Sequence, residues 1–176
     1  MSKIRFETQL LKIHTWTLVR LPASASSKLA SRGMVMVNVV INDVAFEAAL
    51  EPDGAGSHWF RITKTTKQAI AAEAGDTVSL EIEPVTEWSK PALPDDLQIA
   101  LTKVPAAKAV WDTITPKAQW EWLRWIRATK QPQTRTRRIT VACSKLSAGD
   151  KRPCCFNSSA CSEPYISSSG ILIESK

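Results

Sequence analysis

The stretch Thr77-Val78-Ser79-Leu80-Glu81-Ile82-Glu83 alternates polar and apolar residues along its whole length. Successive side chains of a β-strand point to opposite faces, so this period of two is typical of a strand with one face in a core and one in water. Residues 34–41 instead form an almost unbroken apolar, β-branched run, which suits a strand buried on both faces. The first half of the chain is therefore predicted to be built on strands.

Turn signals separate the strands around this stretch. Asn42-Asp43 and the loop Pro52-Asp53-Gly54-Ala55-Gly56 favour chain reversals, because Asn, Asp and Gly adopt turn conformations at low cost. Gly75 marks the end of a compact helix, and a short helical turn is expected within residues 25–31. About six short strands with one helix between them indicate a small β-barrel. The predicted strands cover residues 4–10, 16–21, 34–41, 44–50, 58–62 and 77–83, and the predicted helix covers residues 65–74.

From Glu87 the pattern changes from strands to helices. Prolines punctuate a short linker, and Asp95-Asp96 then place two carboxylates at a helix start, where the helix dipole favours negative charge. Thr115-Pro116 is a good N-cap and first-turn pair for a later helix. Four helices are predicted, over residues 95–104, 106–114, 117–129 and 133–148.

After Gly149 the chain becomes polar, with five serines between Ser158 and Ser168. We expect a mostly irregular tail, either disordered or pinned back by Ile171-Leu172-Ile173 as a last short strand. The predicted fold class is α+β, with a small amino-terminal β-barrel, a carboxy-terminal helical domain and a Cys- and Ser-rich tail. The predicted boundaries are 1–86 for the barrel, 87–94 for the linker, 95–152 for the basic helical domain and 153–176 for the tail.

The composition excludes several classes of protein. The chain has 176 residues, of which 44% are apolar, enough to build a core. No stretch approaches the roughly 18 apolar residues of a membrane span. Residues 1–7 lack the apolar segment of a secretory signal, so a cytoplasmic location is expected.

Positive charge is concentrated in one segment. Residues 103–152 hold 12 Lys and Arg against 3 Asp and Glu, a net charge of +9, whereas residues 1–102 have a net charge of −2. A concentrated positive field attracts polyanions such as nucleic acid or anionic lipid head groups, with a strong dependence on salt. The alternative is a solvated helical face that only aids solubility.

Arginines lie beside tryptophans in this basic segment, an arrangement with which proteins hold phosphates and stack bases. Trp120 and Trp122 cannot share a helical face, since positions two apart lie about 200° apart around a helix. At least one of them must pack against another element or stand exposed. The alternative is that the tryptophans are the core of a small domain. The candidate partner-binding residues are Arg124, Arg127, Arg135, Arg137, Arg138 and Trp122.

His14 and His58 are the only side chains whose ordinary pKa suits a base at neutral pH. The sequence contains neither a Gly-x-Ser-x-Gly nor a His-Glu-x-x-His motif, and its spacing suggests no set of nucleophile, base and orienting group. We therefore expect a protein that is not an enzyme and needs no cofactor. An enzymatic or small-ligand site in the barrel would need one of these histidines beside a cleft.

The four cysteines follow the spacing C-x10-CC-x5-C, which matches no pattern of paired C-x2-C zinc knuckles. Cys143 shares an apolar helical stripe with Ile139 and Leu146 and is predicted to be core. Cationic neighbours lower thiol pKa values, so the cysteines after Lys151-Arg152-Pro153 are either reactive, ligands of a soft metal, or incidental free thiols. The candidate reactive thiols are Cys154, Cys155 and Cys161.

Residues of both halves form recognisable sets. In the first half these are Phe6-Glu7-Thr8-Gln9-Leu10, Trp16, Leu21-Pro22, Arg32-Gly33, Ile41-Asn42-Asp43, Phe46, Leu50-Glu51-Pro52-Asp53-Gly54 and Gly75-Asp76-Thr77-Val78. Together they resemble a small bacterial and archaeal barrel domain of unknown function, a double-split β-barrel. Pro94-Asp95-Asp96-Leu97, Ala100-Leu101, Trp125-Ile126, Ala128, Thr134-Arg135 and Arg138-Ile139 are similar to the YdeI/OmpD-associated, or bacteriocin-protection, family. The resemblance covers about residues 3–152.

The resemblance implies that no enzymatic activity is established. It also implies a link to envelope stress and to resistance to cationic peptides. A segment of net charge +9 repels cationic peptides, so a protective role should act through an anionic or protein partner. Our first hypothesis is a non-enzymatic interaction protein with a basic helical binding surface. The alternative is nucleic-acid binding by the Arg/Trp helices, by analogy with DNA-binding double-split barrels. The third is a ligand or enzymatic site in the barrel.

Overall fold

One antiparallel sheet dominates the first half of the computed structural model, which describes residues 2–174. Within these residues the sheet has seven strands in the order β1-β7-β4-β5-β6-β3-β2. The strand that was not predicted separately is β2, which is too short for a periodicity to show. The strands are β1 (Ile4–Gln9), β2 (Leu11–Ile13), β3 (Trp16–Arg20), β4 (Val35–Ile41), β5 (Val44–Pro52), β6 (His58–Ile62) and β7 (Thr77–Pro84).

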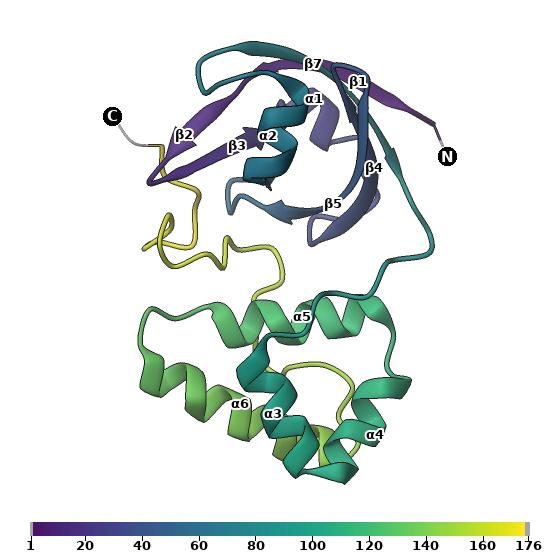
Figure 1. Cartoon of the computed structure of the whole chain (residues 1–176), viewed down its shortest axis with the longest axis vertical. Coiled ribbons are helices and arrows are strands. Elements are labelled where there is room, and N and C mark those ends of the chain that lie inside the picture. The colour runs from purple at the N-terminus through teal and green to yellow at the C-terminus, as the bar shows by residue number, and fades with distance from the viewer. Residues whose placement is uncertain (1, 175–176) are drawn as a thin grey trace. The chain divides into compact units, whose positions relative to one another are not determined.

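The two ends of this sheet are joined by the chain itself. β1 and β2 stand at opposite ends of the strand order, yet Leu10 alone separates them in sequence. The sheet must therefore curl until its ends meet at Leu10. Figure 1 shows the curled sheet. There the Leu10 amide donates to the Asp76 carbonyl at 2.8 Å, and the Gly75 amide donates to the Leu10 carbonyl at 2.8 Å. The predicted α+β class, with a curled sheet followed by helices, is confirmed.

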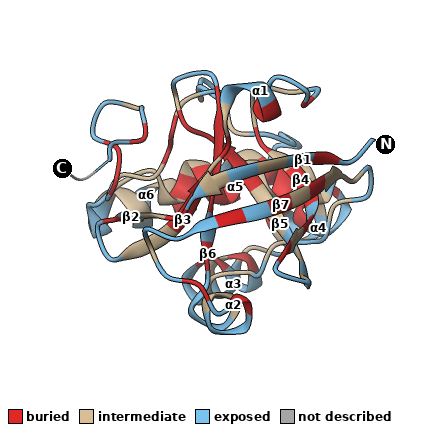
Figure 2. Ribbon diagram, turned by 90° about the horizontal axis from the view of Figure 1, so that it is seen from above, coloured by how far each residue is buried: buried red, intermediate tan, exposed pale blue. Residues whose placement is uncertain are grey.

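Apolar and polar residues alternate along the strands, and the apolar ones form the core inside the curled sheet. Val78, Leu80 and Ile82 of β7 are buried, while Thr77 before them and Ser79 between them are exposed. Figure 2 shows this change from buried to exposed along β7. The prediction that residues 34–41 are buried on both faces is only partly correct. Val37, Val39 and Ile41 are fully buried inside the curl, but on the outer face Asn38 is exposed and Val40 half-buried.

Two short helices belong to the same half of the chain, α1 (Ala23–Ser26) and α2 (Lys64–Ile70). Thr63 caps α2, since its hydroxyl accepts from the Thr66 amide at 3.1 Å. α2 ends four residues earlier than predicted, because Ala71 adopts the left-handed conformation with a φ of 51°. That conformation stops a helix before Gly75 is reached.

The second half contains the four predicted helices, α3 (Asp95–Lys103), α4 (Pro105–Thr113), α5 (Pro116–Arg127) and α6 (Pro132–Ser147). Proline occupies the first turn of α4, α5 and α6, where its missing amide proton costs nothing. Thr115 caps α5 through a hydrogen bond from the Ala118 amide, as predicted. Among residues 2–174, no helix combines the length and hydrophobicity that crossing a membrane requires. The buried core of these helices includes Leu97, Leu101, Trp111, Trp122, Ile126, Ile139, Cys143 and Leu146.

The contacts between residues divide the described part of the chain into two compact units. The barrel unit comprises residues 2–87 together with 158–161 and 165–174, and the helical unit comprises residues 88–157 with 162–164. The barrel unit thus takes its residues from both ends of the chain.

The tail is irregular, as predicted, because residues 153–174 form neither helix nor strand. They are not a disordered chain, however. Cys161, Ile166 and Leu172 are buried in one cluster with Ile13, Leu18 and Trp59 of the barrel unit. The Leu172 amide donates to the Asp53 carbonyl at 2.6 Å, so the segment 171–173 is pinned back without forming a strand.

Gly54 allows the tail to approach the barrel closely. Its φ is +79°, and a Cβ added there would lie 1.9 Å from the Gly170 carbonyl oxygen. We expect Gly54→Ala to displace the tail and to lower the free energy of unfolding by about 1–3 kcal/mol, measured by urea denaturation. Gly56→Ala is the control, since Gly56 also has a positive φ but nothing lies within 4 Å of its added Cβ. Equal losses in the two variants would mean that close packing of the tail contributes nothing.

Candidate functional site

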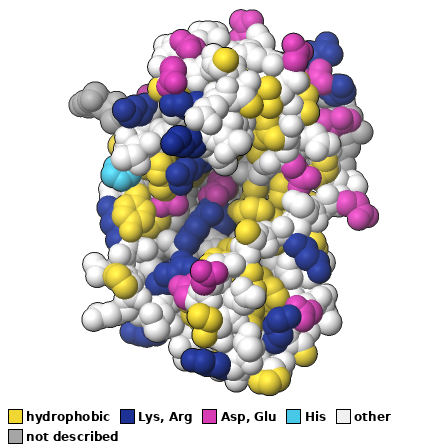
Figure 3. Space-filling view, viewed as in Figure 1, with side chains coloured by type: hydrophobic (Ala, Val, Ile, Leu, Met, Phe, Trp, Pro, Cys, Tyr) yellow, Lys and Arg dark blue, Asp and Glu magenta, His cyan; other side chains and the backbone are white. Residues whose placement is uncertain are grey.

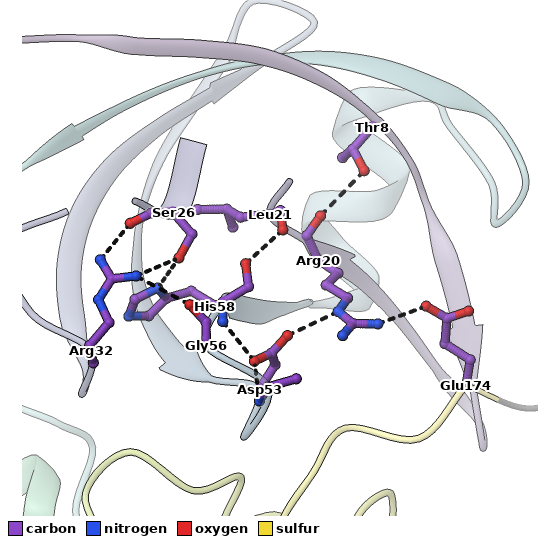
Figure 4. Close-up of polar contacts among 11 residues, drawn as sticks. Thr8, Arg20, Leu21, Ser26, Arg32, Asp53, Gly56, His58 and Glu174 are labelled. Carbon is purple, nitrogen blue, oxygen red and sulfur yellow. Dashed lines mark hydrogen bonds and ion pairs between the residues drawn. The ribbon is translucent and has the colours of Figure 1, made fainter. Parts of the chain in front are cut away.

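A network of buried polar groups lies at the loop between β5 and β6. The Asp53 side chain is fully buried, and its Oδ1 accepts from the amides of Ala55 at 2.8 Å and Ser57 at 2.9 Å. Its Oδ2 accepts from Nε of Arg20 at 3.0 Å. Arg20 also donates to the Glu174 carboxylate at 3.0 Å, as Figure 4 shows. The carboxylate therefore fixes the loop and connects it to β3.

Ser26 and His58 form a buried pair beside this loop (Figure 4). Nε2 of His58 lies 2.8 Å from the Gly33 carbonyl oxygen, which can only accept, so Nε2 carries the proton. Nδ1 of the neutral ring then accepts from the Ser26 hydroxyl at 2.7 Å. Burial lowers the pKa of His58; the Gly33 hydrogen bond opposes this shift and the Arg32 guanidinium adds to it. The ring is held neutral.

A serine hydroxyl on a neutral imidazole is the arrangement of a nucleophile and its base. Neither Ser26 nor His58 is exposed to solvent at all, however, so no substrate reaches them in this conformation. A hollow of about 560 Å³ lies elsewhere, on the outer face of β1, β7 and β4. Its lining comprises Arg5, Phe6, Glu7, Val40, Asn42, Asp43, Ser79, Leu80 and Glu81, and neither histidine is among them.

His14 lies at the turn between β2 and β3, with a φ of 55°. It is exposed, and its ring stacks on Tyr165 with the ring centroids 6.3 Å apart. The ring also meets Trp16 edge-on at 6.4 Å, and the Arg61 guanidinium lies 4.2 Å from the centre of the Trp16 ring. These contacts make an aromatic cluster on the barrel surface rather than a site with a base in a cleft.

Two of the six candidate partner-binding residues lie in the interior. Trp122 and Arg124 have no exposed surface, and the Trp122 indole donates to the Lys151 carbonyl at 3.1 Å. The Arg124 guanidinium lies over the Phe156 ring, 5.2 Å from its centre. A partner cannot touch these two side chains unless the unit opens. The alternative interpretation, tryptophan as core, describes Trp122.

Two further candidates on α6 make contacts inside the helical unit. Arg135 holds both carboxylate oxygens of Asp96, at 2.7 and 3.0 Å, and so joins the first turns of α3 and α6. These hydrogen bonds lower the pKa of Asp96 and raise the pKa of Arg135. Arg138 donates to the Trp125 carbonyl at 2.6 Å, and its guanidinium lies 5.5 Å from the centre of the Trp125 ring. The charged groups of Arg135 and Arg138 are therefore engaged in contacts within the helical unit.

The remaining candidates differ in accessibility. Arg127 is half-buried at the end of α5, whereas Arg137 is exposed on α6 and makes no ion pair with any described residue. Lys103, Lys151 and Arg152 are exposed as well. On the face seen in Figure 3, basic side chains stand among acidic ones rather than forming one continuous patch. The helical unit nevertheless holds 13 Lys and Arg against 6 Asp and Glu, a net charge of +7.

The cysteines fall into two classes. Cys143 and Cys161 are buried, and burial raises the pKa of the Cys143 thiol, so neither is an accessible nucleophile. Cys161 is thereby removed from the candidate reactive thiols. Cys154 and Cys155 are exposed, with their sulfur atoms 2.6 Å apart. Within residues 2–174, no three His, Cys, Asp or Glu side chains stand close enough together to hold a metal ion.

No pattern in the sequence indicated the partners of these groups. Ser26 is 32 positions from His58, and Asp96 is 39 positions from Arg135. No local pattern connects residues so far apart. The one available signal is that Asp95-Asp96 and Arg135 both stand at predicted helix starts, where opposite charges of two packed helices can meet.

A curled β-sheet unit joined to a unit of four helices defines this chain as a two-module α+β protein. Residues 6–82, inside the barrel unit, match the family described as domain of unknown function DUF1905. Residues 90–149, inside the helical unit, match the family described as bacteriocin-protection, YdeI or OmpD-associated. The barrel unit therefore matches the model of the first family and the helical unit the model of the second, in agreement with the resemblance. Comparison with curated proteins gives no match.

The buried His58 makes stability depend on pH. Its pKa is lowered in the folded state, so the unfolded chain binds more protons as the pH falls below about 6.5. We expect the contribution of His58 to the free energy of unfolding to be constant above that pH and to decrease below it, by at most about 1.4 kcal/mol per pH unit. His58→Gln should abolish this dependence and His14→Gln should keep it, as measured by urea denaturation at several pH values. A dependence that survives in His58→Gln would assign it to another group.

The ion pair of Arg135 with Asp96 can be tested against its exposed neighbour on α6. Because Arg135 and Asp96 are both partly exposed, we expect Arg135→Gln to cost only about 0.5–1 kcal/mol of stability. The loss should be present at neutral pH and vanish as acid protonates Asp96, whose pKa is lowered in the folded state. Arg137→Gln, the control, should cost nothing in thermal or urea unfolding. Equal losses of stability in Arg135→Gln and Arg137→Gln would show that the measurement reports the charge of α6 and not the ion pair of Arg135 with Asp96.

Proposed function

We propose that this protein is a non-enzymatic, cytoplasmic interaction protein. Its helical unit binds a protein or anionic partner through exposed basic side chains, and its barrel unit serves as scaffold. The observation that carries the proposal is the uneven charge of the two units. The helical unit has a net charge of +7, whereas the described residues of the barrel unit hold 9 Lys and Arg against 11 Asp and Glu. A field of one sign on a small unit attracts partners of the opposite sign.

The residues that we assign to this binding surface are the basic residues whose side chains are exposed. Arg124, Arg135 and Arg138 are engaged within the helical unit, as their burial and contacts show. Arg137 on α6 and Lys151-Arg152 after it are exposed. Such cations can pair with a partner without first breaking an internal contact, and binding releases their counterions.

The description of the helical unit's family suggests a biological setting. Protection from bacteriocins by direct capture would require attraction to the toxic peptide. A unit of net charge +7 repels a cationic peptide, so we infer that protection acts through an anionic or protein partner in the response to envelope stress.

Nucleic acid is the second candidate partner, favoured by the same positive charge. The stacking of bases on the tryptophans of α5 has little support in the structure. Trp122 is buried, the Trp125 ring lies beneath Arg138, and the Trp120 indole donates to the Ser89 carbonyl at 3.0 Å. Binding would then rest on phosphate contacts, which carry no sequence preference.

A titration with defined polyanions tests the proposal. The probes are vesicles of phosphatidylcholine with and without phosphatidylglycerol, and mixed-sequence single- and double-stranded DNA, each at low and physiological salt. We expect binding to anionic vesicles that weakens steeply with salt. Lys151→Ala with Arg152→Ala should weaken it by roughly 10–30-fold, at about 1 kcal/mol for each charge.

Lys28→Ala with Lys64→Ala is the matched control, because it removes the same charge from exposed positions of the barrel unit. It should leave the affinity nearly unchanged. Binding of DNA but not of vesicles would put the nucleic-acid hypothesis first. No binding to any probe at low salt, or equal losses in the two double variants, would exclude an anionic partner of the helical unit and leave a protein partner to be sought.

A further inference from the structure

Cys154 and Cys155 are neighbours in sequence and in space. Both are exposed, and their sulfur atoms are 2.6 Å apart, against about 2.05 Å in a disulfide bond. In an extended segment, adjacent side chains would point to opposite sides. Here Cys155 adopts the left-handed conformation, with a φ of 58°, and the two thiols face one another.

The residues around the pair hold it in place. Pro153 restricts the backbone before Cys154. Phe156, directly after Cys155, is half-buried with its ring 5.2 Å from the guanidinium carbon of Arg124, which is itself fully buried on α5. The thiols therefore stand at a fixed place on the surface of the helical unit.

The Cys155 thiol resists ionisation. The hydrogen bond to Cys154 raises the pKa of the Cys155 thiol, and the nearby charge of Lys145 opposes this shift. A raised pKa keeps Cys155 mainly protonated near neutral pH, so this thiol suits the resolving role better than the attacking role. The thiolate is the nucleophile in sulfur chemistry.

We propose that Cys154 and Cys155 form a modification site for hydroperoxides, in which Cys154 is oxidised first and Cys155 closes a disulfide between the two neighbours. A sensitive thiol is accessible and stands next to a second thiol that resolves its oxidised form. In this chain the exposed pair alone combines these properties within the described residues, because Cys143 and Cys161 are buried.

The reaction balances with one hydroperoxide. The Cys154 thiolate attacks an oxygen of the peroxide, the O–O bond breaks, and the leaving alkoxide takes up a proton as an alcohol, or as water when the peroxide is hydrogen peroxide. Cys154 is then a sulfenic acid. The Cys155 sulfur attacks the Cys154 sulfur, the S–O bond breaks, and the hydroxyl group leaves as water with the Cys155 proton. The thiols lose two electrons, and the peroxide gains them.

Peptide mapping of the reduced full-length chain tests this assignment. The protein is exposed to hydrogen peroxide near neutral pH, and the remaining thiols are alkylated at intervals. We expect the peptide with Cys154 and Cys155 to lose both alkylation sites together, roughly tenfold faster than Cys143 and Cys161, which serve as internal controls. Dithiothreitol should restore both thiols.

Two variants assign the roles. In Cys155→Ser the sulfenic acid on Cys154 should persist and be trapped by dimedone, whereas Cys154→Ser should lose most of the reactivity at this peptide. Circular dichroism checks that the variants fold. A disulfide between two chains, dimedone trapping on Cys155 in Cys154→Ser at the native rate, or oxidation no faster than that of Cys143 would each overturn the proposal. The result is independent of partner binding.

Discussion

The closure of the sheet at Leu10 is the constraint from which the barrel unit follows. One continuous segment supplies both β1 and β2, so the same stretch of chain pairs with β7 on one side and with β3 on the other. Backbone hydrogen bonds of Leu10 with Asp76 and Gly75 hold the point where the segment bends. With both ends fixed, the inward faces of the strands enclose one apolar core.

Polar groups are buried in the barrel unit as well. Asp53 and His58, on either side of the loop between β5 and β6, have no exposed surface, and an unpaired buried polar group costs about 1–3 kcal/mol. Asp53 accordingly accepts from two backbone amides and from Arg20. Ser26 and His58 bond to each other, and His58 also donates to the Gly33 carbonyl. The Ser–His pair thereby has a structural explanation: each group satisfies the other where water is absent.

Local patterns predicted the elements better than they predicted the surface. Alternation over residues 77–83 and the Thr115-Pro116 pair each depend on neighbours within one turn or strand, and the structure confirms both. The role of Arg135 depends on Asp96, 39 positions away, so a count of charges overstated the accessible surface. Serine content likewise predicted an irregular tail, but the buried side chains of Cys161, Ile166 and Leu172 anchor it to the barrel unit.

The barrel unit takes residues from both ends of the chain, and this has a consequence during synthesis. Ile13, Leu18 and Trp59 are made first, and Cys161, Ile166 and Leu172, which cover them, are made only after the helical unit between them. At about 5–20 residues per second, the ribosome leaves this apolar surface uncovered for roughly ten seconds while the helical unit emerges. The nascent barrel is therefore open to chaperones, and to other nascent chains, over that interval.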